Sequence, residues 1–444
     1  MHNEQEIREE VLRRVKPNEK EERRIWDTVD SLIEKCDREM EKRGYGRNAI
    51  LVGSVAKGTY LKNPDIDIFL RFPKELKKEE LKKLGIEIGK AVIPDGFAKY
   101  AEHPYWRGVY NGFEVDIVPC YMIDSPDEKL SAVDRTPFHT EYVKKNLKDE
   151  QRDEVRLLKA FLKGIGAYGA EAKIQGFSGY LTELLILKYG DFISTLKNVS
   201  KWKKRVYLYL EERGEKFHAP LVFIDPVDKR RNAASAVSEE KKSLFVHAAK
   251  SYLNSPKLEF FFPKKTVPLS REEILERVYE RDTHFYVITL PKPDIIEDNL
   301  YPQIKRSMEA FLKILQEFHP VSDFFVLDEN VHFIIELERN MLPAVKKHEG
   351  PPVWSPHGEN FLERWRENAL RGPYLEGYRW YADIERKYRS IEEIFFANIS
   401  NYKLGKSFEE MKGKIKLRKL DDCIDEINPI SLTEFFDFKF PWER

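Results

Sequence analysis

The sequence predicts an α+β protein of several domains. Its 444 residues are enough for about two to four domains with substantial cores. Apolar residues recur at helical spacing in some segments and alternate with polar residues in others, which predicts helices and strands mixed along the chain. A hydrophobic fraction of 41%, with 13% aromatic residues, excludes general disorder. The chain is therefore neither a peptide-sized binding module nor an unfolded protein.

The N-terminal region predicts a small mixed sheet backed by helices. Apolar residues at helical spacing predict helices over residues 7–15 and 19–43, interrupted at Pro17. The apolar run 49–52 predicts a buried strand that ends at Gly53 and turns into a helix. Further elements are expected as a helix over residues 77–92 and strands over residues 97–102, 106–110 and 113–118.

The rest of the chain divides into a mainly helical middle and an α+β end, with a boundary at Asn254-Ser255-Pro256. Expected in the middle are helices over residues 150–164, 176–188 and 238–253, a strand over residues 221–225 and a turn-rich segment over residues 131–140. Expected at the end are strands over residues 284–290, 324–327 and 331–337, with a helix over residues 300–318. We therefore predict three domains, over residues 1–145, 146–255 and 256–444.

The turn at Gly53 and Ser54 is suited to a phosphate group. A helix that starts directly after a strand exposes backbone N–H groups at its N-terminus, where the helix dipole is positive. The hydroxyl of Ser54 adds another donor. A Gly-Ser pair alone is a weak signal, and it gains meaning from the acidic residues that follow.

Three aspartates predict a metal site. Asp65 and Asp67 alternate with isoleucines, and residues two apart on a strand share one face. A second alternating run predicts a neighbouring strand on which Asp116 and Glu114 share a face. Like charges on one face repel, so a cation is expected among them. Carboxylate oxygens that leave room for waters and phosphates are typical of Mg²⁺ sites in which two ions assist phosphoryl displacement.

The alternative interpretation of these acids is structural. An isolated Asp-x-Asp in a chain with 34% charged residues is usually a solvated edge or turn. The combination of a strand, Gly-Ser, an acidic strand and a second acidic strand favours a catalytic site instead.

Several basic or aromatic positions each admit two interpretations. Lys159 lies among apolar residues of a predicted helix, where it is either a snorkelling lysine or a cation for a triphosphate. His139 by itself is more often structural than a ligand contact. Arg231 fits either a base edge or phosphate, or a surface ion pair. Beyond residue 351, interleaved Arg, Trp and Tyr predict either a nucleic-acid surface or a core helix with a charged outer face.

Charge and cysteine content indicate the kind of partner and the cellular compartment of the protein. A formal net charge of zero argues against a uniformly basic nucleic-acid-binding coat, although basic clusters occur, for example over residues 201–205 and 412–419. Cys36, Cys120 and Cys423 lack C-x-x-C spacing and predict reduced thiols in a cytoplasmic protein. The charged N-terminus is unlike a signal peptide, and no apolar run approaches membrane-spanning length.

These motifs resemble those of the nucleotidyltransferases of the DNA polymerase β superfamily, and specifically those of archaeal-type, class I CCA-adding enzymes. The resemblance covers at least residues 50–305 and rests on GSVAKGTYLKNPDIDIF, YAEHPY, EVDIVPCY, SAVDRTPFH, EVRLLKAFLK, YGAE, GFSGYLTELLI, DPVDKRRN and KPDIIEDNLYPQ. It implies a polymerase β-like catalytic head over residues 1–145. It further implies a helical central domain for the nucleotide and the RNA 3′ end over residues 146–255, and a tRNA-binding α+β region over residues 256–444.

The resemblance also implies an activity and a set of site residues. The activity is template-independent addition of C, C and A to the tRNA 3′ end from CTP and ATP, with Mg²⁺ and release of pyrophosphate. Asp65, Asp67 and Asp116 would hold the metals, with Asp116 helping to deprotonate the 3′-hydroxyl, and Arg231 would contact the base and the RNA end. Contacts to the nucleotide are implied for Ser54, Lys57, His139, Lys159 and Tyr168. A homodimer is implied as well.

Two departures and two rival functions accompany this resemblance. Where family members have arginine and glutamate, this chain has Lys57 and Asp65, and the spacing from Ser54 to the acids is one residue shorter. Lys57 keeps the charge but loses the bidentate fork of arginine. One rival function is a related poly(A) or terminal uridylyl polymerase, which shares the acidic strand motif. The other is a non-catalytic RNA-binding protein, and the presence of all three acids argues against this second rival.

Overall fold

The computed structural model describes residues 4–99 and 104–444, and the chain divides into two compact units. The first unit contains residues 1–264 together with residues 440–444, and the second contains residues 265–439. Within the described residues, none of the helices combines the length and the apolar character needed to cross a bilayer. The overall α+β class predicted from the sequence is confirmed.

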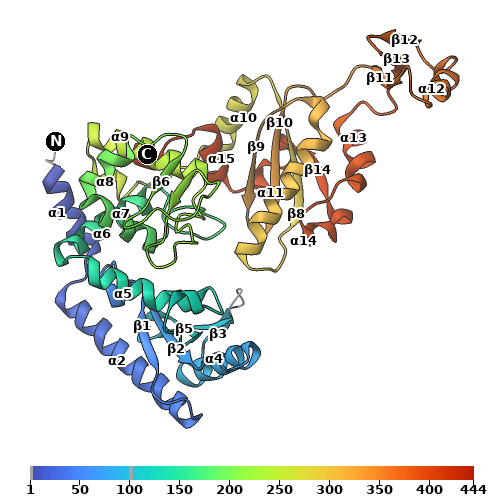
Figure 1. The fold of residues 1–444 in the computed structure, drawn as a ribbon. Helices are drawn as coiled ribbons and strands as arrows, with labels where there is room; N and C mark the ends of the chain where they lie inside the picture. Colours follow the sequence, from blue (N-terminus) through green and yellow to red (C-terminus); the bar gives the residue numbers. More distant parts are fainter. Residues whose placement is uncertain (1–3, 100–103) are drawn as a thin grey trace. The chain divides into compact units, whose positions relative to one another are not determined.

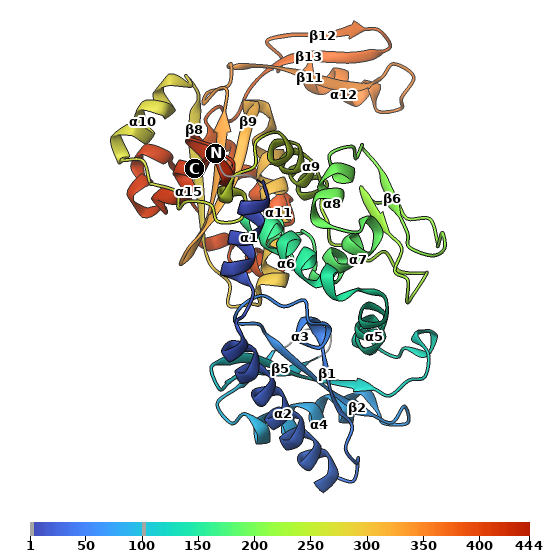
Figure 2. The same ribbon diagram turned by 90° about the vertical axis from the view of Figure 1, so that its left-hand side faces the viewer.

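The first unit begins with a five-stranded mixed sheet in the order β1-β2-β5-β4-β3. Its strands are β1 (Ala49–Val52), β2 (Ile66–Phe72), β3 (Phe97–Lys99), β4 (Tyr105–Tyr110) and β5 (Phe113–Tyr121). Strands β2 and β5 are parallel, and the other neighbours are antiparallel. The helices α2 (Glu19–Lys42) and α4 (Lys78–Val92) share one hydrophobic core with the sheet, and both ribbon views show them beside it (Figures 1 and 2).

The alternation in β2 places its side chains as the sequence predicts. Ile66 and Ile68 are fully buried in the core beneath the helices. Asp67 therefore points to the opposite face, where the core is smaller and consists of residues such as Val52 and Val118. The strand at residues 97–102 is confirmed only over β3, because residues 100–102 lie outside the described residues.

The remainder of the first unit is mainly helical. Its elements are α1 (Glu4–Val15), α5 (Thr136–Asn146), α6 (Asp149–Gly164), α7 (Gly179–Tyr189), α8 (Phe192–Val199) and α9 (Glu239–Asn254), with a parallel pair formed by β6 (Val206–Leu208) and β7 (Leu221–Phe223). The core centres on Phe161, whose ring centroid lies 5.6 Å from that of Phe192 and 5.7 Å from that of Phe260. Helix α1 and Trp442, from opposite ends of the chain, both join this core.

One local expectation in this unit is wrong, and one predicted helix is confirmed with a later start. Residues 131–140, predicted to be rich in turns, contain a 3₁₀ helix (Val133–Arg135) and the first residues of α5. Pro137 occupies the first turn of α5, where its missing N–H costs no hydrogen bond and its fixed φ favours a helix start. The helix expected from residue 176 begins only at Gly179, because the Ser178 side chain caps it by accepting a hydrogen bond from the backbone N–H of Leu181.

The second unit contains a four-stranded antiparallel sheet in the order β14-β8-β10-β9. Its strands are β8 (His284–Pro291), β9 (Pro320–Leu327), β10 (Asn330–Leu337) and β14 (Lys416–Lys419). One face packs against α11 (Glu297–Ile314), α13 (Ile391–Asn398) and α14 (Lys406–Glu409). The other face packs against α10 (Arg271–Glu280) and α15 (Pro429–Phe436). The small α+β unit predicted from the sequence is confirmed.

The segment rich in Arg, Trp and Tyr forms a separate sheet within the second unit. It consists of β11 (Val345–Pro352), β12 (Arg371–Glu376) and β13 (Arg379–Glu385) with the short helix α12 (Gly358–Trp365). The rings of Trp354 and Tyr378 stack 5.2 Å apart, and both are largely exposed. The interpretation of this segment as a core helix is therefore wrong, and its nucleic-acid role stays a prediction.

Candidate active site

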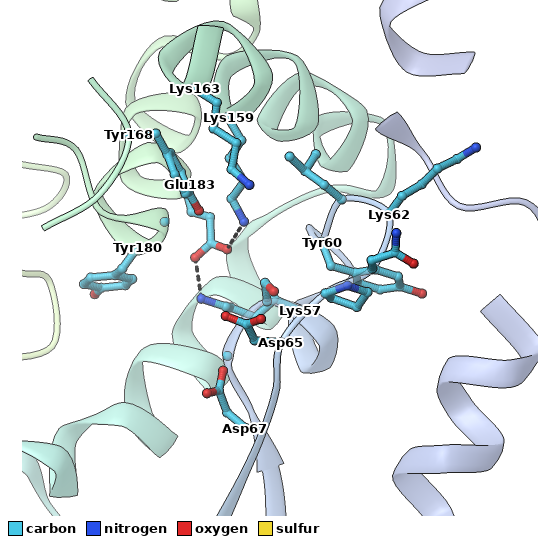
Figure 3. A pocket seen from close by; sticks show the side chains of 16 residues that line it. Lys57, Tyr60, Lys62, Asp65, Asp67, Lys159, Lys163, Tyr168, Tyr180 and Glu183 are labelled. Carbon is cyan, nitrogen blue, oxygen red and sulfur yellow. Dashed lines mark hydrogen bonds and ion pairs between the residues drawn. The ribbon is translucent and has the colours of Figure 1, made fainter. Parts of the chain in front are cut away.

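The pairing of β2 with β5 brings the predicted acidic residues into one neighbourhood. Asp67 and Asp116 are register partners on these parallel strands, and Asp65 directly precedes β2. Asp65 and Asp67 line a cavity of about 340 Å³, where Figure 3 shows them beside Lys57. Asp116 is not among the lining residues of this cavity. Two of the three acids therefore face the cavity, and the third lies on the adjacent strand.

Gly53 makes room for the Asp67 carboxylate. It begins α3 (Gly53–Lys57) directly after β1, with a φ of +72°, which glycine adopts readily. A Cβ atom at this position would lie 2.1 Å from Oδ2 of Asp67. The glycine that the sequence places in a phosphate-binding turn therefore also permits the turn to approach the acid.

The negative charges clustered around Asp67 favour binding of a cation. Burial, together with the negative charges of Asp116 and Asp65, raises the pKa of Asp67 to about 7. Burial also raises the pKa of Asp65. Carboxylate oxygens are the donors that hard divalent cations prefer. The chemistry of this donor set therefore fits a divalent metal ion.

Arg107, which sequence analysis did not identify, holds Asp116. It lies on β4 as the register partner of Asp116. Its Nε and Nη2 atoms each donate a hydrogen bond of 2.6 Å to the Asp116 carboxylate, and Nη1 donates one of 3.2 Å to Glu114. Across residues 4–99 and 104–444, no group of three or more His, Cys, Asp or Glu side chains is arranged to hold a metal ion. Arg107 thus engages both oxygens of the Asp116 carboxylate and would compete with a metal ion for them.

Two predicted phosphate-binding lysines share one buried carboxylate. Lys57 Nζ lies 2.5 Å from Oε2 of Glu183, and Lys159 Nζ lies 3.5 Å from its Oε1. Thr59 also donates a 2.5 Å hydrogen bond to Oε1. All three charged residues line the cavity, and Figure 3 shows the lysines on either side of the glutamate. The snorkelling interpretation of Lys159 is wrong, because its side chain is buried.

Ser54 and Tyr168 line the same cavity. The hydroxyl of Tyr168 lies 2.9 Å from the position that a Cβ atom on Gly179 would take, so the glycine lets the ring approach α7. The ammonium group of Lys163, another lining residue, lies 5.3 Å from the centroid of the Tyr168 ring. The cavity therefore combines three acids, four lysines and polar hydroxyl groups.

His139 and Arg231 meet at a different carboxylate, that of Asp225. His139 Nε2 lies 2.9 Å from Oδ2 of Asp225, and Arg231 Nη1 donates a 2.8 Å hydrogen bond to the same oxygen. The Tyr180 hydroxyl donates a 2.9 Å hydrogen bond to Oδ1, and its ring stacks on His139 with centroids 4.1 Å apart. Neither His139 nor Arg231 lines the cavity, but Tyr180 does. The Asp225 cluster therefore adjoins the cavity through one tyrosine.

Three family models match successive parts of the chain. They are a nucleotidyltransferase domain over residues 33–139, the second domain of tRNA nucleotidyltransferase over residues 153–262, and the C-terminal domain of CCA-adding enzymes over residues 281–416. With the acid-bearing sheet, these matches define a nucleotidyltransferase. The CCA-adding enzyme of Thermoplasma volcanium is 38% identical over 96% of both chains. The chain belongs to the family of CCA-adding enzymes.

Other relatives and one solved structure extend this comparison. The CCA-adding enzyme of Thermoplasma acidophilum is 40% identical over 93% of this chain and 94% of its own. That of Methanothermobacter thermautotrophicus is 38% identical over 98% of both chains. A structure of CdnC from E. coli MS115-1 with ATP aligns with a TM-score of 0.44 and 17% identity, over 59% of this chain and 96% of its own. The predicted family and enzyme class are confirmed by the curated relatives and the family models.

Proposed function

We propose that the chain adds C, C and A in order to the 3′ end of tRNA, using CTP and ATP without a nucleic-acid template and releasing pyrophosphate. The observation that carries this proposal is the cavity of the first unit, in which Asp65 and Asp67 face the lysines Lys57 and Lys159. Acids that hold a metal and cations that hold a triphosphate are the two parts that nucleotidyl transfer needs. Family membership supports tRNA as the acceptor.

Mg²⁺ is the proposed metal, held by Asp65, Asp67 and Asp116. Nucleotidyltransferases generally use divalent metal ions, and the raised pKa of Asp67 is what a buried carboxylate among other acids shows before a cation joins it. When bound, Mg²⁺ neutralises negative charge on the attacking and leaving oxygens. We assign to Asp116 the further task of accepting the proton of the tRNA 3′-hydroxyl.

The nucleotide is held by residues of the cavity and its border. Ser54, Lys57, Lys159 and Tyr168 line the cavity, and we propose that they bind mainly the triphosphate. His139 is proposed to join them from the Asp225 cluster, in which Arg231 is proposed to contact the base and the RNA end. Because these groups position the substrates and neutralise charge, no covalent intermediate with the protein is needed.

The domain roles, quaternary state and compartment are proposed on the same basis. Residues 1–145 are proposed to form the catalytic head, residues 146–255 the part that holds the nucleotide and RNA end, and residues 256–444 the tRNA-binding region. The enzyme is proposed to work in the cytoplasm as a homodimer. Light scattering of the full chain measures the oligomeric state directly.

An incorporation assay tests the proposed activity. The full chain is incubated with Mg²⁺ and tRNA that lacks its last three nucleotides, with each nucleoside triphosphate alone and with CTP and ATP together. We expect two cytidines to be added from CTP and one adenosine only after them, and extension to stop there. A homopolymer tail would instead indicate a poly(A) or terminal uridylyl polymerase. Salt-dependent tRNA binding without any incorporation would indicate a non-catalytic protein.

Replacing Arg107 by alanine is expected to strengthen metal binding. The bidentate ion pair of Arg107 competes with the metal for Asp116, so its removal should lower the half-saturating metal concentration by about threefold to tenfold. Titration of the tRNA-free protein with Mn²⁺, followed by electron paramagnetic resonance, measures this directly. Arg43→Ala is the matched control, because Arg43 makes a 2.6 Å ion pair with Glu39 far along α2. Weaker Mn²⁺ binding in the Arg107 variant would contradict the competition.

A further inference from the structure

Glu183 is a buried acid at the wall of the nucleotide cavity to which the reaction assigns no task. Its side chain on α7 has no exposed surface. A lone carboxylate inside a protein is costly unless it is paired. Here it has two cationic partners, Lys57 from α3 and Lys159 from α6, and one neutral donor, Thr59. Figure 3 shows Glu183 between Lys57 and Lys159, with Lys57 beside Asp65.

The charges of this cluster do not cancel. Lys57 and Lys159 carry two positive charges between them, and Glu183 carries one negative charge. Although burial alone raises the pKa of Glu183, the two lysines outweigh it and hold that pKa below its ordinary value, so the glutamate is ionised. Glu183 therefore leaves one positive charge of the two lysines uncompensated within this cluster, on the same cavity that Asp65 and Asp67 line, and a triphosphate would supply negative charge there.

Without Glu183, the two ammonium groups would face each other in a buried site. Burial lowers the pKa of Lys159 to about 8, the positive charges of Lys57 and Arg156 lower it too, and Glu183 opposes them. Lys159 also donates a 3.0 Å hydrogen bond to the backbone oxygen of Thr59, which fixes its ammonium group beside the glutamate. The groups that face Lys159 are thus Lys57 from α3, Glu183 from α7, Arg156 from its own helix and the backbone oxygen of Thr59.

We propose that Glu183 is a positioning residue that keeps Lys57 and Lys159 charged and aimed at the triphosphate, and thereby sets the affinity for the nucleotide. This inference rests on the proposed function, because it takes the cavity to be the nucleotide site. The competing explanation is that Glu183 only ties α3 to α6 and α7 as a structural ion pair. The two explanations differ in how nucleotide affinity responds to pH.

The test measures equilibrium binding of CTP to the full chain without tRNA, between pH 6 and 10, so that it is independent of turnover. In the unaltered protein, the Kd for CTP is expected to rise above about pH 8 as Lys159 loses its proton, separately from the change that ionisation of Asp67 causes near pH 7. Glu183→Gln keeps the size of the side chain and removes its charge. It is expected to raise the Kd about tenfold at neutral pH and to start the alkaline rise about one pH unit lower.

The second variant, Lys57→Met, is expected to shift the alkaline rise of the Kd in the opposite direction, towards higher pH. Because Lys57 lowers the pKa of Lys159, its removal should move the alkaline rise above pH 8, even though one phosphate contact is lost. This result does not depend on whether the glutamine variant folds. Glu154→Gln is the matched control, since Glu154 on α6 makes a 2.5 Å ion pair with Arg8 outside the cavity. It is expected to lower the unfolding temperature without changing the pH dependence of CTP binding.

The possible outcomes separate the explanations. Opposite movements of the alkaline rise in the Glu183 and Lys57 variants support the positioning role. An unchanged rise in both variants, with only a lower unfolding temperature, overturns it and leaves a structural ion pair. CTP binding by a protein that extends no tRNA would refute the proposed activity but not the role of Glu183.

Discussion

Replacing Asp67 by alanine is expected to lower CTP incorporation into tRNA by about a thousandfold or more, while the affinity for tRNA stays nearly unchanged. The Asp67 side chain lines the cavity, and burial with two neighbouring acids raises its pKa to about 7. Its removal takes a ligand from the proposed metal without altering a proposed tRNA-binding surface. Single-turnover incorporation at saturating metal measures the loss, and filter binding measures the tRNA affinity.

Two further variants make this test specific. Asp116→Ala is expected to cause a loss of the same order, because Asp116 is the register partner of Asp67. Glu114→Gln is the matched control. Glu114 lies two residues away on β5, is exposed and also contacts Arg107, and its loss should change incorporation by less than about threefold. Retained turnover in both aspartate variants would refute the metal assignment, and an equal loss in the control would indicate general disruption of the sheet.

A stability measurement distinguishes loss of a metal ligand from loss of the fold. The folded-state pKa of Asp67 lies above its ordinary value of 3.8, so the folded protein binds this proton more tightly than the unfolded chain. The contribution of Asp67 to the free energy of unfolding therefore falls as the pH rises from about 4 to 7. Asn cannot ionise, so Asp67→Asn removes the loss of stability that ionisation of the buried carboxylate causes. Without metal, the variant should unfold at a higher temperature than the unaltered protein at pH 8, and the difference should shrink at pH 5.

The elements that carry the acids follow from local sequence patterns. The apolar run that forms β1 ends where glycine interrupts it, and the alternation of acids with isoleucines in β2 directs Asp67 away from the core. The same alternation identifies β5. Because such patterns repeat every two residues, a short window of sequence is enough to predict these strands and the faces on which their side chains lie.

The partners of the site residues have no comparable local pattern. Glu183 stands in the apolar stretch of α7, and its partner Lys57 lies 126 residues earlier. Asp225 contacts His139, which lies 86 residues earlier in the chain. Arg107 is one arginine among many in a highly charged chain, and only the register of β4 with β5 places it on Asp116. These contacts arise from tertiary packing, which a single sequence without its folded structure does not reveal.

Replacing Gly53 by alanine is expected to lower incorporation about a hundredfold with only a small loss of stability. A side chain at a φ of +72° costs about 1–2 kcal/mol. The larger effect comes from position, since the added Cβ would lie 2.1 Å from Oδ2 of Asp67 and must displace that carboxylate. Misplacing a reacting or metal-binding group by about 1 Å commonly costs two orders of magnitude in rate. Incorporation kinetics and thermal unfolding measure the two effects separately.

Gly44→Ala isolates the contribution of backbone strain. Gly44 has a φ of +85°, similar to that of Gly53, but a Cβ atom there would meet nothing within 4 Å. Its replacement should therefore cost a similar amount of stability and leave incorporation unchanged. If both variants lose stability alike and neither loses activity, the contact between Gly53 and Asp67 does not position the acid. If only Gly53→Ala loses activity, the close approach of the β1 turn to β2 is what holds Asp67 in place, because backbone strain is common to both variants.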